Sequence, residues 1–283
     1  MRIRLSGIAP AAIFILSALS AHATTLNVVF YNNQFGTLND ATGAYNQVGT
    51  LPISASAGIA YMDGTMYLEN MGSDLYTVNP STGVSSLVGE TGLVTTAGAF
   101  AGDSYGLFEV DYASNLYSLN PGTGQAQFMD STGLPANNGA FDTSLSASGV
   151  SLYYTVGAPG ADDELFMLNI LSGLTTDLGS TGVTGIAGSA VVGSELELYQ
   201  YGQGTNFIYS APIGSTDFAR DTQLTAQIID GGAVISSWSA SVSQSTESAG
   251  VPEPGSGLLL LAGLVSLPLT RRGRKPAING SGR

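Results

Sequence analysis

Several side chains that carry common enzyme chemistry are missing from most of this chain. Its 283 residues include no Cys, one His (His22) and one Lys (Lys275). Residues 24–250 therefore contain no Cys, His or Lys. Within that region the sequence excludes disulfides, Ser-His-Asp and Cys-His catalysis, His- or Cys-ligated zinc, the phosphate-loop lysine and Schiff-base chemistry. Carboxylate chemistry, calcium held by oxygen ligands, and contacts through hydroxyl or aromatic groups stay open.

Positive charge is also scarce. Between residues 24 and 250, Arg220 is the only basic residue against 20 acidic ones, a net charge of −19. Such a surface repels phosphate backbones, which argues against nucleic acid as a partner. Only 10% of all residues are charged, whereas about 25% is usual. With 38 Gly and 43% hydrophobic residues, the composition predicts a turn-rich all-β protein with a substantial core.

The N-terminus has the layout of a secretory signal. Arg2 and Arg4 precede an apolar stretch at residues 8–19, and Ala21 and Ala23 supply the small residues of a signal-peptidase site. We therefore expect residues 1–23 to be a signal peptide cut after Ala23. The alternative is an N-terminal membrane anchor, for which the apolar stretch is short. An exported chain without Cys depends on packing for its stability.

The C-terminus has three parts in a fixed order. The motif Val251, Pro252, Glu253, Pro254 is followed by an uncharged apolar run at residues 255–269. A basic cluster then contains Arg271, Arg272, Arg274 and Lys275, and a tail follows at 276–283. As a helix the run would be about 22 Å long, short for a bilayer core of about 30 Å. Snorkelling arginines and local thinning would make up the difference, with the basic cluster cytoplasmic and residues 24–250 outside.

This end, residues 251–275, resembles the PEP-CTERM sorting signal of exported proteins in Gram-negative bacteria that make exopolysaccharide. The resemblance implies that an exosortase recognises residues 251–254, removes the tail and passes the protein to the cell surface or extracellular matrix. The chain would occupy the inner membrane transiently, through its C-terminal helix. The tail after the basic cluster is longer than this family leads us to expect. A simple tail anchor is the alternative. The Ser-rich composition of residues 243–250 predicts a flexible linker.

The region between the two ends is repetitive. A Leu-aromatic pair, a hydrophobic residue, Asn and a terminal Gly recur at residues 75–83, 116–124 and 165–173, with partial copies at 38–43 and 208–214. The alternating part predicts a strand, Asn starts a turn, and Gly takes its left-handed position. Each copy therefore predicts a hairpin.

A second feature keeps the same period. In four copies the turn Gly is followed 15 residues later by a Gly in a small-residue segment, and in the last copy 18 residues later. These second glycines are Gly58, Gly98, Gly139, Gly188 and Gly232. Periods of 40 to 49 residues with four strands each are typical of propeller blades, whose inner strands crowd around an axis. We predict a five-bladed β-propeller over residues 24–242, its first blade completed by a strand within 232–242. The alternatives are a β-sandwich and a six-bladed ring.

Few residues stand out as ligand-binding candidates. Asp162, Asp163 and Glu164 lie in the extra length of the third period, around residues 157–164, where we expect a protruding loop. Three carboxylates are candidate calcium ligands, but they do not match the EF-hand spacing, and we favour the alternative of a solvated acidic loop. No other metal or cofactor is predicted. Asp63 and Asp103 fall at expected turns, which disfavours paired catalytic carboxylates, and Asp142 is the exception.

Tyrosines form a second group of candidates. Tyr153 and Tyr154 are adjacent, and Tyr199 and Tyr201 alternate with Glu195 and Glu197. If these tyrosines are exposed, their rings would stack on sugars. If they are buried, they would pack between blades.

The functional hypothesis is an exported, non-enzymatic propeller that binds or organises exopolysaccharide, with divalent cations bridging an acidic surface to an anionic polymer. One alternative is an extracellular carbohydrate-active hydrolase or lyase, or a calcium-dependent lactonase-like enzyme. Another is an inert coat protein.

Overall fold

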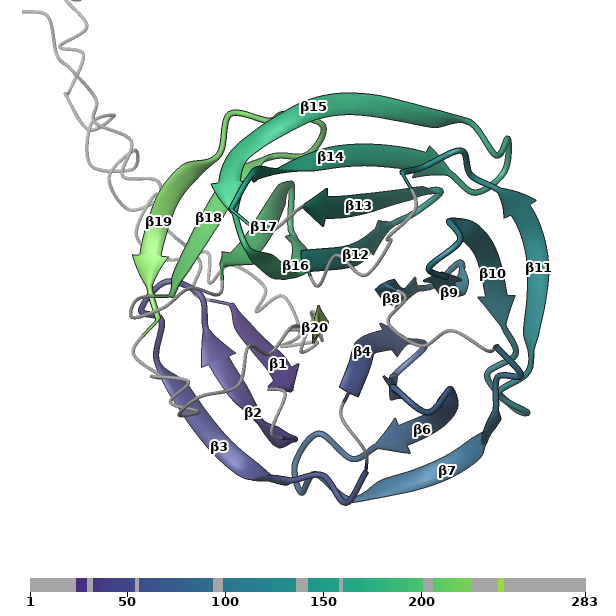
Figure 1. Ribbon diagram of the computed structural model, residues 1–283. Helices are drawn as coiled ribbons and strands as arrows, with labels where there is room; N and C mark the ends of the chain where they lie inside the picture. Colours follow the sequence, from purple (N-terminus) through teal and green to yellow (C-terminus); the bar gives the residue numbers. More distant parts are fainter. Residues whose placement is uncertain are drawn as a thin grey trace, which may run out of the picture. The chain divides into compact units, whose positions relative to one another are not determined.

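The computed structural model describes residues 24–29, 33–53, 56–93, 99–135, 142–157, 160–200, 206–224 and 239–241. All of them belong to one compact unit, Met1–Gln244. The described residues form twenty strands in five four-stranded antiparallel sheets and no helix. Each sheet is one blade of a propeller (Figure 1).

The four strands of each blade follow one another from the axis outward. Blade 1 contains β20 (Ser239–Ser241), β1 (Thr25–Val29), β2 (Gln34–Asn39) and β3 (Tyr45–Thr50). Blade 2 contains β4 (Ser56–Met62), β5 (Thr65–Asn70), β6 (Asp74–Val78) and β7 (Ser85–Glu90). Blade 3 contains β8 (Ala99–Asp103), β9 (Gly106–Val110), β10 (Asn115–Leu119) and β11 (Ala126–Ser131). Blade 4 contains β12 (Asp142–Ser148), β13 (Ser151–Gly157), β14 (Asp162–Asn169) and β15 (Thr175–Thr184). Blade 5 contains β16 (Ile186–Val192), β17 (Glu195–Gln200), β18 (Phe207–Pro212) and β19 (Ala219–Gln223).

The five innermost strands close a ring. β4 contacts β8, β8 contacts β12, β12 contacts β16, and β20 contacts both β16 and β4. Blade 1 combines both ends of the domain, because β20 pairs antiparallel with β1, with Val28 opposite Ala240. The predicted five-bladed propeller with a mixed first blade is therefore confirmed. Gly98, Gly139 and Gly232 lie outside the described residues.

Small residues recur along the inner strands, as the repeat predicts. Gly58 lies in β4, where a Cβ atom would come within 2.6 Å of the Cβ of Phe100 in the next blade. Ala60, Ala101 and Ala190 are buried at comparable places on β4, β8 and β16. Short side chains therefore allow the inner strands to approach one another.

The turn between the third and fourth strands has the chemistry that the sequence predicts. In blade 2, Asn79 Oδ1 accepts the Ser81 N–H at 2.9 Å, and the Gly83 N–H donates to the Asn79 carbonyl at 2.8 Å. Gly83 has φ +70°, and Gly124 at the same place in blade 3 has φ +81°. Each Asn therefore closes the turn, and the Gly supplies the left-handed residue that it requires.

The fourth strand of every blade carries a β-bulge that the sequence analysis does not predict. In blade 2, Leu75 lies opposite Gly89 and Tyr76 opposite Leu87, which leaves Val88 as the extra residue. The pairing shifts at the same place in the other four blades. A bulge increases the local twist, which suits a strand that wraps the rim.

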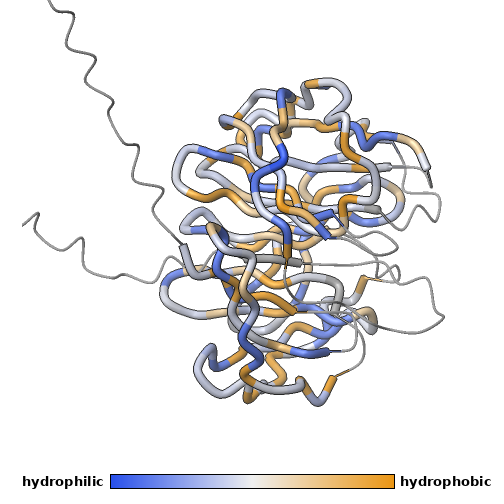
Figure 2. The backbone as a smooth tube through the Cα atoms, turned by 90° about the vertical axis from the view of Figure 1, so that its left-hand side faces the viewer, coloured by the Kyte–Doolittle hydropathy of each residue, from blue (hydrophilic) through white to orange (hydrophobic). Residues whose placement is uncertain are grey.

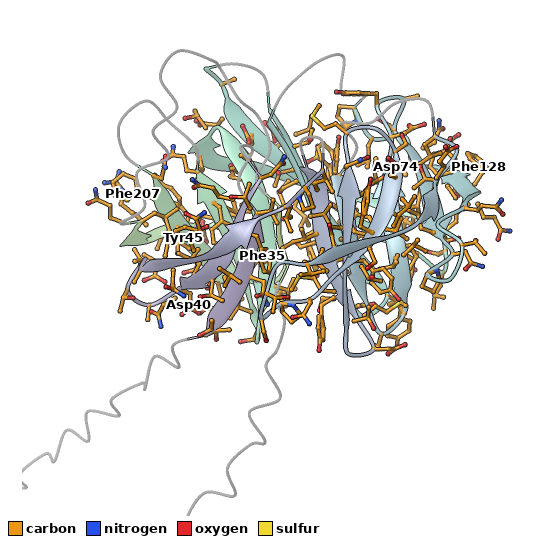
Figure 3. All side chains as sticks on the ribbon, turned by 90° about the horizontal axis from the view of Figure 1, so that it is seen from below. Phe35, Asp40, Tyr45, Asp74, Phe128 and Phe207 are labelled. Carbon is orange, nitrogen blue, oxygen red and sulfur yellow. The ribbon has the colours of Figure 1, made fainter. Side chains whose placement is uncertain are left out.

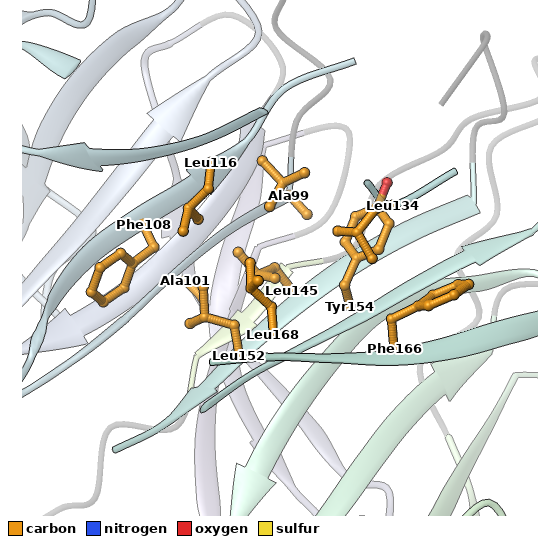
Figure 4. Close-up of a cluster of buried hydrophobic side chains, with 11 residues drawn as sticks. Ala99, Ala101, Phe108, Leu116, Leu134, Leu145, Leu152, Tyr154, Phe166 and Leu168 are labelled. Carbon is orange, nitrogen blue, oxygen red and sulfur yellow. The ribbon is translucent and has the colours of Figure 1, made fainter. Parts of the chain in front are cut away.

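Each seam between neighbouring blades holds one hydrophobic cluster. Between blades 2 and 3 it includes Ala60, Tyr67, Leu75, Leu107 and Leu119. The largest lies between blades 3 and 4 (Figure 4). Apolar and polar stretches accordingly alternate over short distances along the chain (Figure 2). The middle strands of a blade are covered on both faces, so their side chains are buried on both sides.

No helix within the described residues is long and apolar enough to cross a membrane. The helix that we expect at residues 255–269 lies outside those residues, as do the signal peptide at 1–23, the linker at 243–250 and the tail at 276–283.

Candidate functional site

The acidic residues expected at turns lie at turns. Asp63 occupies the hairpin between β4 and β5 with φ +49°. Asp103 ends β8, and its Oδ1 accepts the Tyr105 N–H at 2.7 Å. Its Oδ2 accepts the Gly149 N–H of blade 4, also at 2.7 Å. The Asp103 carboxylate therefore holds the backbone of its turn and joins blades 3 and 4.

The candidate calcium ligands lie in a strand, so the prediction of a loop at these residues is wrong. Asp162, Asp163 and Glu164 are the first residues of β14. The additional residues of the third period lengthen β13 and β14. Asp162 and Glu164 are exposed, whereas Asp163 is fully buried, as strand alternation requires. The Asp163 Oδ2 accepts the Ile186 N–H of blade 5 at 2.9 Å, and a side chain at Gly157 would collide with this carboxylate.

Within the described part of the chain, no group of three or more acidic or His side chains is arranged to hold a metal ion. Asp163 is turned away from Asp162 and Glu164, so these three carboxylates do not converge. The calcium hypothesis therefore gains no support from their placement.

Two fully buried glutamates face each other across the seam between blades 2 and 3. Glu69 on β5 has 1% of its surface exposed and Glu109 on β9 has 0%. Glu69 shares its strand face with Tyr67, and Glu109 shares its face with Leu107, both from the cluster of that seam. No other described residue donates a hydrogen bond to any of the four carboxyl oxygens.

Burial raises the pKa of both carboxyls. The pKa of Glu69 lies well above its usual range because of burial, the nearby charge of Glu109 and a hydrogen bond between the two carboxyls. Burial is also the main cause of the raised pKa of Glu109. The hydrogen bond with Glu69 lowers this pKa, and the carboxylate of Asp111 raises it. A hydrogen bond between two carboxyls needs a proton, so the pair favours a protonated state.

A third buried glutamate lies in the seam between blades 5 and 1. Glu197 on β17 is 4% exposed, and the Tyr199 hydroxyl donates to its Oε2 at 2.5 Å. Burial raises the pKa of Glu197 to about 7, although the bond from Tyr199 lowers it. This glutamate therefore has the donor that the Glu69–Glu109 pair lacks.

Matching polar groups hold the hairpins between the second and third strands of blades 2 and 3. In blade 2 the Asn70 amide donates to Asp74 Oδ2 at 3.1 Å. In blade 3 the roles are exchanged, because the Asn115 amide donates to Asp111 Oδ2 at 3.1 Å. The Tyr117 hydroxyl also donates to Asp111 Oδ2, at 3.2 Å. These Asn–Asp pairs bond to one another and so stabilise the hairpins.

The tyrosine candidates pack in seams. Tyr153 is 4% exposed, Tyr154 1% and Tyr199 0%, so the packing interpretation is confirmed for these three. Tyr201 lies outside the described residues, as does the side chain of Asp142.

Some of the exposed apolar and aromatic side chains lie on outer strands, and the others lie in turns. Leu87 on β7 is 60% exposed and lies opposite Tyr76. Phe128 on β11 is 55% exposed and lies opposite Tyr117 at the same position of the next blade. The rings of Tyr117 and Phe128 meet edge to face with centroids 5.8 Å apart. We call Tyr76, Leu87, Tyr117 and Phe128 the rim patch.

A different aromatic group lies on blade 5. The guanidinium of Arg220 stands over the ring of Phe207, 4.2 Å from its centroid. The Tyr209 ring meets Phe207 edge to face at 6.4 Å. Phe207 and Phe128 lie on opposite sides of the rim (Figure 3).

Sequence reasoning missed the buried glutamates and the rim patch. Glu69, Glu109 and Glu197 each stand beside apolar residues in a second strand, and such strands are buried on both faces. That combination was the available signal. The remaining predicted site residues lie outside the described residues, namely Ala21, Ala23, Val251, Pro252, Glu253, Pro254, Arg271, Arg272, Arg274 and Lys275.

Comparison with known proteins supports the fold. No protein-family model matches the chain, and no curated protein sequence matches it. Among solved structures, it is similar to a chain in the crystal structure of a nidogen/laminin complex, with a TM-score of 0.50 and 12% identity. The match covers 69% of this chain and 76% of that chain. At this identity the likeness shows the propeller fold alone.

Proposed function

We propose that this protein is an exported propeller of the cell surface or extracellular matrix that binds exopolysaccharide through its rim patch, without catalysing a reaction. The single observation that carries this proposal is a repeat within the rim patch. The same pairing of a tyrosine with an exposed apolar side chain occurs in two neighbouring blades, Tyr76 with Leu87 in blade 2 and Tyr117 with Phe128 in blade 3.

The chemistry of the rim patch suits a sugar polymer. Sugar rings present apolar faces edged by hydroxyl groups, and tyrosine offers an apolar ring with a polar tip. Phe128 has one ring edge against Tyr117 and remains 55% exposed. β7 and β11 follow each other around the rim (Figure 1), so successive sugars of one chain can contact both blades. Exposed apolar patches of this kind commonly mark binding surfaces.

Two further observations favour binding over catalysis. The carboxylate pair Glu69–Glu109 is buried and cannot contact a polymer. The structural neighbour also comes from a complex between two proteins, so a propeller of this fold can serve as a binding module. The cell-surface destination rests on the resemblance of residues 251–275 to an exosortase signal.

Co-sedimentation tests the binding proposal. Residues 24–250, which contain all five sheets, are mixed with exopolysaccharide purified from the producing organism, in calcium and in EDTA. We expect saturable binding, and we expect Phe128→Ala to weaken it roughly tenfold, as loss of a central aromatic contact does. Leu171→Ala is the control, because Leu171 is a 76% exposed side chain of blade 4.

The outcomes separate the alternatives. Loss of binding in EDTA would add a cation bridge between the acidic domain and the polymer. Absence of binding in both conditions contradicts the proposal and favours an inert coat protein. Equal binding by the wild type and Phe128→Ala would place the contact elsewhere.

The sorting proposal has its own test. Replacing residues 251–254 with alanines should retain the protein, with its tail, in the inner-membrane fraction, whereas the wild type reaches the surface shortened. Glu247→Ala in the linker is the control. Mass spectrometry should also find an N-terminus at Thr24. The same distribution and mass for the wild type and the alanine variant would contradict exosortase processing.

A further inference from the structure

No described residue near the Glu69–Glu109 pair carries positive charge. Residues 24–219 contain no Lys, Arg or His, and Arg220 lies in blade 5 against Phe207. The two carboxyls face each other at 1% and 0% exposure, and no other described residue donates to their four oxygens. Neither a salt bridge nor an observed N–H group compensates the charge that ionisation would place there.

The groups around the pair are apolar or acidic. Tyr67 and Leu75 lie on the blade 2 side of the seam, and Phe100, Leu107 and Leu119 on the blade 3 side. A further carboxylate, that of Asp111, acts on Glu109 from the residue that directly follows β9, and Asp111 is bonded to the Tyr117 hydroxyl and to Asn115. The titratable groups facing the pair are thus Tyr67, Asp111 and Tyr117, and none of them carries positive charge.

An isolated buried carboxylate is costly, and two in contact repel each other in addition. One proton placed between them removes one charge and supplies the missing hydrogen bond, as in carboxylate dyads. We propose that Glu69 and Glu109 share one proton across the seam between blades 2 and 3, and that losing this proton above neutral pH loosens the seam. This proposal does not depend on polysaccharide binding at the rim patch.

The sign of the effect follows from the direction of the shift. Both carboxyls hold their protons more tightly in the folded chain than in the unfolded chain. The resulting stability is fully present below the unfolded pKa of about 4.3 and is lost as the pH rises through the folded pKa. The ring should therefore be most stable in mildly acidic solution, the opposite of a fold held by salt-bridged carboxylates.

Thermal unfolding of residues 24–250, followed by circular dichroism from pH 5 to pH 9, tests the proposal. The wild-type midpoint should fall as the pH rises. In Glu69→Gln the amide donates to Glu109 at every pH, so the fall should be smaller and the midpoint at pH 8 higher by roughly 3–8 °C. Glu109→Gln should behave in the same way and serves if the first variant does not fold.

Glu90→Gln is the matched control, because Glu90 is an exposed glutamate of the same blade, on β7. It should follow the wild type. Glu197→Gln should reduce the pH dependence independently, because Glu197 lies in the seam between blades 5 and 1. Identical pH profiles for the wild type, Glu69→Gln and Glu109→Gln would overturn the proposal.

Carbon-13 NMR of the glutamate carboxyl groups measures the pH at which each carboxyl titrates, which tests protonation separately from packing. We expect three resonances that titrate above pH 6 in the wild type, those of Glu69, Glu109 and Glu197. In Glu69→Gln one of them disappears, the resonance of Glu109 shifts to lower pH, and the resonance of Glu197 is unchanged. Titration of both Glu69 and Glu109 below pH 5 would refute a shared proton. If millimolar calcium restores the midpoint at pH 8 in the wild type and not in Glu69→Gln, a bound cation replaces the proton and the proposal fails.

Discussion

Single glycines decide how closely neighbouring blades approach. Gly124 ends the turn of blade 3 with φ +81°, and a Cβ there would lie 2.6 Å from the carbonyl oxygen of Gly89 in blade 2. Gly133 has a similar φ of +67°, but nothing lies within 4 Å of its Cβ position. Both positions require a left-handed backbone, but only a side chain at Gly124 would collide with a neighbouring blade.

Alanine substitution at these two glycines separates the two effects. Gly133→Ala should cost about 1–2 kcal/mol of the free energy of unfolding, because a residue with a side chain is strained in the left-handed region. Gly124→Ala should cost about 2–4 kcal/mol, because the new methyl group also pushes against a backbone carbonyl. Urea unfolding of both variants measures the difference. Equal losses would mean that the turn moves freely away from blade 2.

At the same scale, the local chemistry of the turns can be predicted from the sequence, whereas the pairing of Glu69 with Glu109 cannot. Asn79 and Gly83 act through bonds within five residues, so their roles follow from their spacing. Glu69 and Glu109 lie 40 positions apart, and only the packing of two blades brings them together.

Among the elements, the repeat predicts strand order better than strand length. Five blades, small inner strands and the turn after the third strand all follow from the period, because each blade is a local unit. The sequence predicts a loop for the additional residues of the third period, because Gly157 and Asp162 are of types common in turns. In the structure they extend β13 and β14, since Asp163 finds a buried place against β16.

The bulge in each fourth strand could not be predicted from the pattern. Val88 and Leu178 are hydrophobic residues in strands, and alternation alone would pair them regularly. The bulge arises because an outer strand must follow the rim while it remains bonded to a straighter inner neighbour. It is a property of the ring, visible only when the five sheets are assembled.

For the whole molecule, the closure of blade 1 by β20 predicts the effect of truncation. A chain that ends at residue 238 lacks β20, leaves the edge of β1 unpaired and removes contacts with β4 and β16. We expect a lower midpoint of thermal unfolding, and association through the open edge at high concentration. Circular dichroism and size-exclusion chromatography measure both. A chain ending at residue 250 is the control, and unchanged behaviour of the shorter chain would show that closure adds little.

The same closure sets the order in which the protein can be completed. The ribosome releases β1, β2 and β3 first, but their innermost partner comes about 200 residues later. At roughly 5–20 residues per second, that delay is on the order of 10–40 s. The first blade is thus the last to be finished, and throughout the delay its inner edge is open to other chains or to a chaperone. A protein built in this way benefits from assistance early in its life, before any of its surfaces has a function to perform.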